Sequence, residues 1–429
     1  MWRRVAAIPI WIVSSVLAQE AEPEGLLANA KARAAENLAR IPDFTCGLTV
    51  DRSQRAAPKA AWMRADTLRL EVTLIGNQER YAWPGNSAFE DRHLAELVKR
   101  GTVGTGSFAV HARNVLVAAG AEFIWSGPAE LQNGSKALRY DYEVPAAQSR
   151  YRIRNGTEEA VVGFRGAIWL DPENLDLVKL MVHADEIPPA LGIVSVTETV
   201  EYARVKLSTG VFWMPRASEL LTETSHGDAS RNMTVYTDCR QYSAESKISF
   251  TATDETSVTA SVAAAPIQVP SRAILELSLD ADIDLAKAAA GEPVLATVAK
   301  DLKDAEKILI PEGTRVRGRI VRIDRESQPS PLYIVGLEMH TLEFAEGPRV
   351  LRATLEDVSG GPGLIRDVKS MSSMFNGKRE RTPALSLLTR GQQRGSGMIH
   401  WDAKHPRIKK GFRMKWRTEE ASEVNETRP

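Results

Sequence analysis

The chain has 429 residues, of which 43% are hydrophobic and 26% are charged. These proportions are typical of a soluble globular protein and argue against a disordered or membrane-embedded chain. One hydrophobic core rarely serves a chain of this length, so we expect two domains. The formal net charge is +0, but the basic residues concentrate toward the C-terminal end.

Residues 1–18 have the pattern of a secretory signal peptide. A short basic segment, "MWRR", precedes the apolar stretch "VAAIPIWIVSSVLA", and small residues suited to cleavage stand before Gln19. A buried first helix is the alternative. No later stretch approaches the length of apolar sequence that spans a membrane. We therefore expect cleavage after Ala18 and a mature chain without a transmembrane segment, located in the periplasm or secreted.

The chain contains two cysteines, each inside a strand-like segment. Cys46 lies in "PDFTCGLTV" and Cys239 in "TVYTDCRQY". Export favours a disulfide, and two cysteines allow one intramolecular pairing. Closing so long a loop would contribute about 5 kcal/mol on the chain-entropy model, before any strain is subtracted. The alternative is a pair of buried free thiols.

One helix and a series of strands follow the predicted signal peptide. Apolar residues recur at helical spacing over residues 23–40, and Pro42 ends the pattern. Alternation of apolar and polar residues predicts antiparallel strands with one wet face at 66–76 and 136–145. The alternation is less regular at 193–205, because Glu198 interrupts the apolar face. Further strands are predicted at 150–154, 159–171, 177–186, 211–221 and 231–243.

Two helical segments are predicted between the early and late strands, at residues 90–101 and 107–123. A glycine-rich connection, "GTVGTGS", joins them. These elements and the strands around them form a predicted N-terminal domain of residues 19–250.

The second half of the chain predicts a separate domain. Residues 251–271 are rich in Thr, Ala, Ser and Val and end in two prolines, which indicates a linker. Strand patterns then return over residues 272–418, apart from a polar segment near 365–397 that predicts a mobile loop. We expect a small β-barrel or sandwich there, and a disordered tail at 419–429.

The order of these elements resembles an uncharacterised family of secreted acidobacterial proteins over residues 22–250. The resemblance rests on "PDFTC", on "GTGSFAVHARNVLVAAGAEFIWSG" and "YDYEVPAAQSRYRI", and above all on "WLDPENLDLVKL". More distantly, the layout is similar to the lipoprotein-carrier fold of LolA and LolB. That resemblance implies a mainly β, α+β domain, in which a curved antiparallel half-barrel sheet wraps on helices around an apolar cavity.

The resemblance implies a structural role for the cysteines and none for individual ligand-binding residues. Cys46 would lie on the first strand and Cys239 on the last, so that the disulfide would join the two ends of the curl. In the C-terminal domain, "ILIPEGTRVRGRIVRID" and "KKGFRMKWRT" are similar to exported β-barrel domains of conjugative secretion scaffolds.

The sequence contains no complete catalytic motif. The seven histidines form no HExxH pattern, and no serine lies in a Gly-x-Ser-x-Gly turn. Asp280, Asp282 and Asp284 have calcium-loop spacing, but Leu285 stands where the loop needs glycine. "GTVGTGS" lacks the Gly-Lys-Ser/Thr ending of a phosphate loop. We therefore expect a non-enzymatic protein without a metal or cofactor.

The first feature that could support binding is the apolar face of the predicted N-terminal sheet. If the helices do not fill this face, a cavity remains for an acyl chain or another apolar ligand. The alternative is a simple core. The residues of the predicted cavity are Leu68, Leu70, Val72, Tyr140, Tyr142 and Val196.

The second feature is a basic C-terminal segment. Residues 364–418 contain fourteen Lys or Arg against three Asp or Glu. Trp401, Phe412 and Trp416 are interleaved among the basic side chains, a mixture that binds anionic surfaces. The alternative is a solvated face whose lysines discourage edge-to-edge aggregation. The predicted basic surface comprises Lys409, Lys410, Arg413, Lys415 and Arg417.

Together these features predict an exported cell-envelope protein that binds a lipid or other apolar ligand in its N-terminal half-barrel. The alternative is a structural or assembly component of the envelope or of a secretion apparatus. Such a component would contact a partner protein or an anionic surface through the basic C-terminal domain. An exported protein rarely meets nucleic acid, so we expect no nucleic-acid partner.

Overall fold

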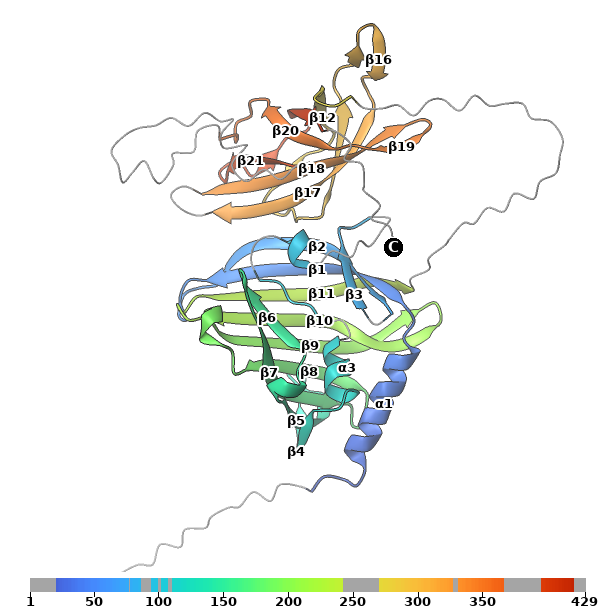
Figure 1. Cartoon of the computed structure of the whole chain (residues 1–429), viewed down its shortest axis with the longest axis vertical. Coiled ribbons are helices and arrows are strands. Elements are labelled where there is room, and N and C mark those ends of the chain that lie inside the picture. The colour runs from blue at the N-terminus through green and yellow to red at the C-terminus, as the bar shows by residue number, and fades with distance from the viewer. Residues whose placement is uncertain are drawn as a thin grey trace, which may run out of the picture.

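The computed structural model contains two large antiparallel sheets, which follow one another along the chain (Figure 1). It describes residues 21–76, 78–85, 94–98, 102–106, 110–241, 270–326, 331–365 and 395–419. The predicted signal peptide, most of the predicted linker, nearly all of the predicted loop and all of the predicted tail except Glu419 lie outside these residues. They stay predictions.

The first sheet is the curved antiparallel half-barrel that the resemblance implied. Its strands run in the order β3-β2-β1-β11-β10-β9-β8-β7-β5-β4, and β6 pairs with β7 beside this path. The strands are β1 Phe44–Arg55, β2 Met63–Ile75, β3 Gln78–Ala82, β4 Glu122–Glu130, β5 Lys136–Val144, β6 Tyr151–Asn155, β7 Glu158–Leu170, β8 Leu177–Asp185, β9 Ile193–Leu207, β10 Gly210–Thr224 and β11 Ala229–Gln241. We call this sheet and its helices the half-barrel.

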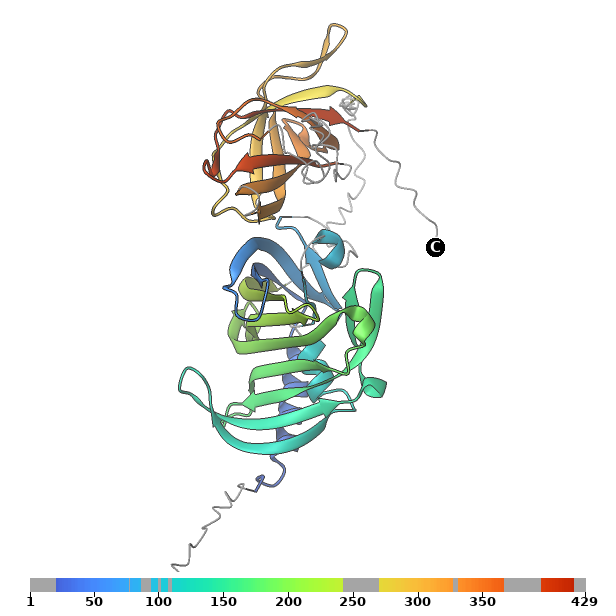
Figure 2. The same ribbon diagram turned by 90° about the vertical axis from the view of Figure 1, so that its left-hand side faces the viewer.

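Helices lie on the concave side of the half-barrel (Figures 1 and 2). The helix predicted at 23–40 is present as α1, Leu26–Arg40, and α2 is the short turn Leu94–Leu97. Helix α3, Val110–Leu116, ends earlier than predicted. Gly120 then reverses the chain at φ 124°, and residues predicted as helix begin β4. Single 3-10 turns occur at Ala146–Gln148 and Pro189–Leu191.

The first and last strands of the half-barrel lie side by side, and the predicted disulfide joins them. Cys46 on β1 is bonded to Cys239 on β11, with Cα atoms 4.0 Å apart. The bond lies at a β-bulge, where Asp238 and Cys239 stand opposite Cys46 alone. The expectation that the disulfide joins the two ends of the curl is wrong, because the edges of the sheet are β3 and β4. It instead fixes the pairing of two neighbouring inner strands.

The second sheet curls until its ends approach each other, which favours the barrel over the sandwich (Figure 2). Its strands run in the order β19-β18-β17-β14-β12-β23-β20, and β21 pairs with β18. At the gap, Leu355 of β20 donates its N–H to the carbonyl of Ser396, just before β21, at 3.5 Å. A Cβ at Gly397 would lie 2.0 Å from the Leu355 Cβ, so glycine permits this approach. We call this sheet the C-terminal barrel.

The strands of the C-terminal barrel and its two small accessory sheets are as follows: β12 Ile274–Leu279, β13 Ile283–Asp284, β14 Pro293–Val298, β15 Leu302–Asp304, β16 Lys307–Ile310, β17 Arg315–Glu326, β18 Leu332–Phe344, β19 Gly347–Val350, β20 Ala353–Val358, β21 Gly397–Asp402, β22 Arg407–Ile408 and β23 Arg413–Thr418. The accessory pairs are β13 with β22 and β15 with β16.

The half-barrel and the C-terminal barrel meet at strand β2. Strand β3 covers only the second half of the β2 edge, so Thr67 and Arg69 present free backbone groups there. Ala290, in the loop before β14, accepts from the Arg69 N–H at 2.7 Å and donates to the Thr67 carbonyl at 2.9 Å. Ala290 is 1% exposed and belongs to the half-barrel core. One residue of the C-terminal unit therefore pairs with the open edge like a short extra strand.

Gly291 makes this close approach possible. It has φ 99°, and a Cβ there would lie 2.0 Å from the Arg69 carbonyl oxygen. We expect Gly291→Val to break the junction and leave both sheets folded, which small-angle scattering would detect as an expanded shape. Gly313→Val is the matched control, because Gly313 has φ 86° with nothing within 4 Å of its Cβ position. An unchanged scattering profile for Gly291→Val would contradict this description of the junction.

The disulfide should contribute strongly to the stability of the half-barrel. Its loop spans a sequence separation of 193 residues. Replacing Cys46 and Cys239 together by Ser should lower the free energy of unfolding by about 2–5 kcal/mol, since the unfolded chain regains its freedom. Urea unfolding of the full chain measures the change, and the wild type in reductant serves as a matched comparison. Equal midpoints for all three samples would refute the expectation.

Candidate functional site

A hollow opens on the concave face of the half-barrel, between strands β1 and β2 on one side and β9 to β11 on the other. Space not occupied by atoms amounts to about 430 Å³, open solvent included, and the enclosed part has room for about two water-sized groups. Its first wall is apolar: Leu48, Val50, Leu68 and Leu70. Because side chains alternate along a strand, Leu48 and Val50 of β1 reach the same face as Leu68 and Leu70 of β2. We call this space the first hollow.

The opposite wall of the first hollow is largely polar: Glu198, Ser218, Asn232, Thr234 and Tyr236. Polar side chains at these positions interrupt the apolar alternation of β9, β10 and β11. Glu198 is 3% exposed, which is unusual for a carboxylate unless it has a partner. The first hollow therefore has an amphipathic lining rather than the uniformly apolar lining of a core cavity.

Two short segments outside the sheet complete the lining of the first hollow. Leu94, Val103 and Gly104 line it. Asn232 donates its side-chain N–H to the Thr102 carbonyl at 2.8 Å, and Ser230 bonds the Thr102 hydroxyl at 2.8 Å. A Cβ at Gly104 would lie 2.8 Å from a methyl carbon of Leu220, so glycine lets this segment lie close to the sheet.

A buried ion pair occupies the centre of the half-barrel. His111 of α3 lies with its Nε2 atom 2.9 Å from a carboxylate oxygen of Glu198 on β9. Burial opposes the charged imidazolium, but the hydrogen bond and negative charge of Glu198, helped by Glu79, outweigh it and raise the pKa of His111. Tyr151 packs edge-on against the imidazole, with ring centroids 5.6 Å apart. Helix α3 is therefore attached to the sheet by charge as well as by packing.

Glu79 on β3 positions the start of α3. Its carboxylate accepts from the Gly106 N–H and the Tyr81 hydroxyl, both at 2.8 Å, and from the Val110 N–H at 3.4 Å. Gly106 has φ 105°, and a Cβ there would lie 2.9 Å from the His111 Nε2 atom. Glycine at this position thus leaves room for the imidazole of the ion pair.

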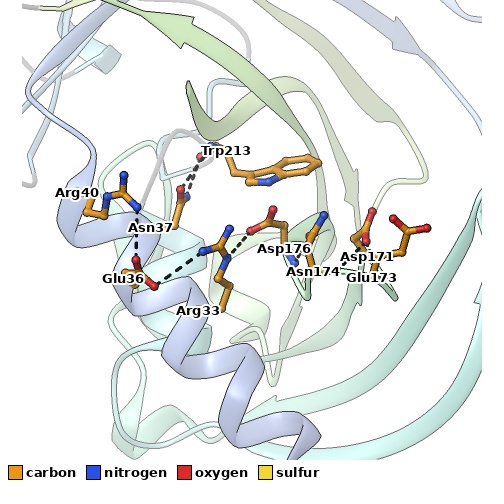
Figure 3. Close-up of polar contacts among 9 residues, drawn as sticks. All are labelled: Arg33, Glu36, Asn37, Arg40, Asp171, Glu173, Asn174, Asp176 and Trp213. Atoms are coloured by element: carbon orange, nitrogen blue, oxygen red, sulfur yellow. Dashed lines mark hydrogen bonds and ion pairs between the residues drawn. The ribbon is translucent and has the colours of Figure 1, made fainter. Parts of the chain in front are cut away.

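A second hollow lies under helix α1, near the point where β8 begins. Arg33 of α1 donates to one carboxylate oxygen of Asp176 at 3.0 Å (Figure 3). Asn37, one turn further along α1, donates to the Trp213 carbonyl at 3.1 Å and accepts from its N–H at 3.5 Å. Glu36 pairs with Arg33 at 3.8 Å and with Arg40 at 3.4 Å on the exposed side of the helix.

The motif "LDPENLD" sets the position of Asp176. The Asp171 side chain accepts from the N–H groups of Glu173 and Asn174, and Asn174 in turn accepts from the Asp176 N–H at 2.9 Å (Figure 3). Such side-chain-to-backbone bonds stabilise tight turns. This turn therefore also orients a buried carboxylate toward α1.

The six residues of the predicted cavity do not line one space. Leu68 and Leu70 line the first hollow, and Val72 lies in the same core cluster without lining it. Tyr140 and Tyr142 pack in a separate cluster with α1 and α3, and Val196 packs in another near the β6 end. The alternation along the strands predicted one common face for these residues, and the curvature of the sheet distributes them over three core clusters.

The predicted basic surface carries its own acidic partners. Lys409 pairs with Asp282 at 3.0 Å, and Arg417 pairs with Glu356. In the strand register, Lys415 stands between Glu276 and Asp357. Lys410 donates its backbone N–H to Asp282, and Arg413 donates its own to Ser359.

The aromatic residues of this segment are not interleaved with its charges on the surface, as the sequence suggested. Trp401, Phe412 and Trp416 are between 0% and 7% exposed and belong to the core of the C-terminal barrel. The alternation along β23 explains the correction, because it places Arg413, Lys415 and Arg417 outward and Met414 and Trp416 inward.

Metal and membrane features were sought within the described residues. No group of three or more His, Cys, Asp or Glu there is arranged to hold a metal ion. Asp280, Asp282 and Asp284, which have calcium-loop spacing, bind Thr297, Lys410 and Arg407 respectively. None of the helices in the described ranges has the length and apolar character needed to span a bilayer.

Comparison with known proteins yields similarities of fold only. No family model matches the chain, and no curated protein matches it. A LolA superfamily protein from Nitrosomonas europaea is 11% identical, covers 51% of this chain and 94% of its own, and has a TM-score of 0.26. A DUF1329 family protein from Desulfovibrio piger is 8% identical with the same coverage and a TM-score of 0.28.

A further solved structure, MucB in complex with MucA(peri), is 10% identical. The match covers 92% of this chain and 100% of that chain, with a TM-score of 0.17. Neither this similarity nor the two shorter ones assigns a ligand or a reaction to the residues described above.

The raised pKa of His111 predicts a pH-dependent stability. Since the folded pKa lies above the ordinary value of 6.5, the ion pair with Glu198 stabilises fully below 6.5 and is lost as pH rises through the folded value. The wild type should therefore have a higher free energy of unfolding than His111→Gln. This difference should be largest at about pH 6 and smallest at about pH 9. Denaturant unfolding across this range gives the difference. His226→Gln, in an exposed turn, is the control. A constant or growing difference would contradict the ion pair.

Proposed function

We propose that this chain is an exported protein of the cell envelope whose half-barrel binds a lipid or another apolar ligand. The observation that supports it most is the first hollow, with an apolar wall of Leu48, Val50, Leu68 and Leu70 facing a polar wall around Glu198. An amphipathic molecule suits such a lining, because its tail and its polar end each find a matching surface.

The arrangement around the first hollow supports a binding role. His111 and Glu198 are both buried and are hydrogen-bonded to each other. Glu198 also lines the hollow, so its carboxylate can meet the polar end of a ligand. The pairing of His111 with Glu198 fixes α3 on the concave face and leaves the wall of β1 and β2 as the contact surface for a ligand.

Location in the envelope is supported by two features of the chain. Residues 1–18 predict a signal peptide. The Cys46–Cys239 disulfide suits an oxidising compartment such as the periplasm or the extracellular space. We therefore place the ligand among the apolar and amphipathic molecules of the envelope.

Filling the first hollow should abolish binding. Thr234 on β11 is half-buried and lines the polar wall, so Thr234→Trp places an indole in the space. We expect the affinity for a fluorescent fatty acid to fall by about tenfold or more, a loss near 1.4 kcal/mol or above. Fluorescence titration of the full chain measures this affinity.

The matched control uses the neighbouring residue on the same strand. Val235 is 47% exposed and points to the opposite face, so Val235→Trp should leave the affinity unchanged. Equal loss in both variants, or absence of binding by the wild type, would overturn the proposal. If the wild type binds and only Thr234→Trp loses affinity, native mass spectrometry of protein purified from its own host would identify any lipid that co-purifies.

A further inference from the structure

The second hollow contains polar atoms that lack partners. It lies between α1 and the strands β8 to β10, and its empty space is about 360 Å³, open solvent included. The enclosed part has room for about two water-sized groups. Asp176, Tyr202 and Trp213 all line it. None of these residues lines the first hollow, so the two spaces have separate walls.

Three polar atoms around this space are shielded from solvent and have no hydrogen-bond partner among the described residues. They are the second carboxylate oxygen of Asp176, the hydroxyl of Tyr202 and the indole N–H of Trp213. Leaving a buried polar group unpaired costs about 1–3 kcal/mol. Three such groups around one hollow indicate that a polar guest completes it.

The surrounding contacts hold two of these groups in fixed positions. Asp176 is 3% exposed, and its other carboxylate oxygen already accepts from Arg33. The Trp213 backbone is bonded on both sides to the Asn37 side chain (Figure 3). Asp176 and Trp213 are therefore held beside the hollow before any guest arrives.

Charge and hydrogen-bond direction define the guest. Arg33 compensates the Asp176 carboxylate, so a neutral guest leaves no buried charge unpaired. Burial raises the pKa of the Tyr202 hydroxyl well above its usual range, so this group stays protonated and donates. Trp213 also donates, whereas Asp176 accepts. The guest must therefore offer one hydrogen-bond donor and two acceptors. These groups must fit an enclosed space that has room for about two water molecules.

Two adjacent hydroxyl groups meet all of these requirements. Each hydroxyl both donates and accepts, and each is about the size of a water molecule. The remaining wall includes Leu38, Leu116 and Ala112, against which the C–H faces of a guest pack. We propose that the second hollow binds the vicinal diol of a sugar or a glyceryl group. This site goes beyond the proposed function and does not depend on it.

The indole N–H of Trp213 gives a direct readout. The full chain is labelled with ¹⁵N at its tryptophan indoles, and Trp213→Phe assigns the signal among the nine tryptophans. Addition of 1,2-propanediol should shift this signal saturably, because the N–H gains an acceptor. The isomer 1,3-propanediol has the same atoms without adjacent hydroxyls and should shift it at least tenfold less at equal concentration.

A matched pair of variants tests the carboxylate. Asp176→Asn keeps an oxygen for Arg33 but replaces the free acceptor, so the half-saturating concentration of 1,2-propanediol should rise about tenfold or more. Glu36→Gln, on the exposed side of α1, should leave it unchanged. If Asp176→Asn does not fold, the comparison of the two propanediols in the wild type still tests whether the second hollow binds a vicinal diol.

Two further ligands distinguish the sources of the diol. A methyl glucoside represents a sugar, and a short-chain monoacylglycerol below its micelle concentration represents a glyceryl lipid. A stronger shift with either one supports the proposal and assigns the source. No saturable shift with any diol, or equal shifts with the two propanediols, would show that the hollow holds water only and would overturn it. Either result leaves fatty-acid binding in the first hollow unaffected.

Discussion

The pairing of β1 with β11 is the constraint on which the rest of the structure depends. It joins the two ends of the half-barrel chain in the middle of the sheet, and the Cys46–Cys239 bond fixes it at a bulge. Because β1 is thus an inner strand, β2 and β3 extend the sheet beyond it, and β1 and β2 together supply the apolar wall of the first hollow. The free part of the β2 edge then receives Ala290 from the C-terminal barrel. One long-range pairing therefore decides the shape of the concave face and the place where the two sheets meet.

The half-barrel buries several polar and charged side chains, among them His111, Asp176 and Glu198. Burying a charge is costly unless a partner compensates it, and the structure meets this cost in pairs, as with His111 and Glu198 or Arg33 and Asp176. Each pair attaches a helix to the sheet, α3 in the first case and α1 in the second. The helices therefore lie at defined positions on the concave face and leave small hollows with polar and apolar walls. The concave face therefore has two separate small hollows among the described residues where the resemblance implied one apolar cavity.

The C-terminal barrel buries fewer polar side chains, and among its described residues they are Arg319 and Thr418. Its aromatic residues form the core, and the basic side chains of β23 lie beside acidic neighbours on β12 and β20. A surface on which Lys415 stands between Glu276 and Asp357 attracts anions less than its lysine and arginine content suggests. The described part of this unit therefore resembles a solvated barrel surface. Its clearest contact with the rest of the chain is the loop that reaches β2.

The sequence by itself determined most of the described elements, though not β4 or the end of α3, and the pairing of the cysteines. Alternation along β2 and β5, helical spacing along α1 and the turn in "LDPENLD" are local patterns, set by the period of each structure. The interruption by Glu198 was visible too, but its partner His111 lies 87 residues earlier. Only the tertiary structure decided that β1 lies beside β11, that Tyr140 and Leu68 face different spaces, and that Trp416 points inward. These outcomes depend on sheet curvature and on contacts between distant residues, whose free energies no short stretch of sequence contains.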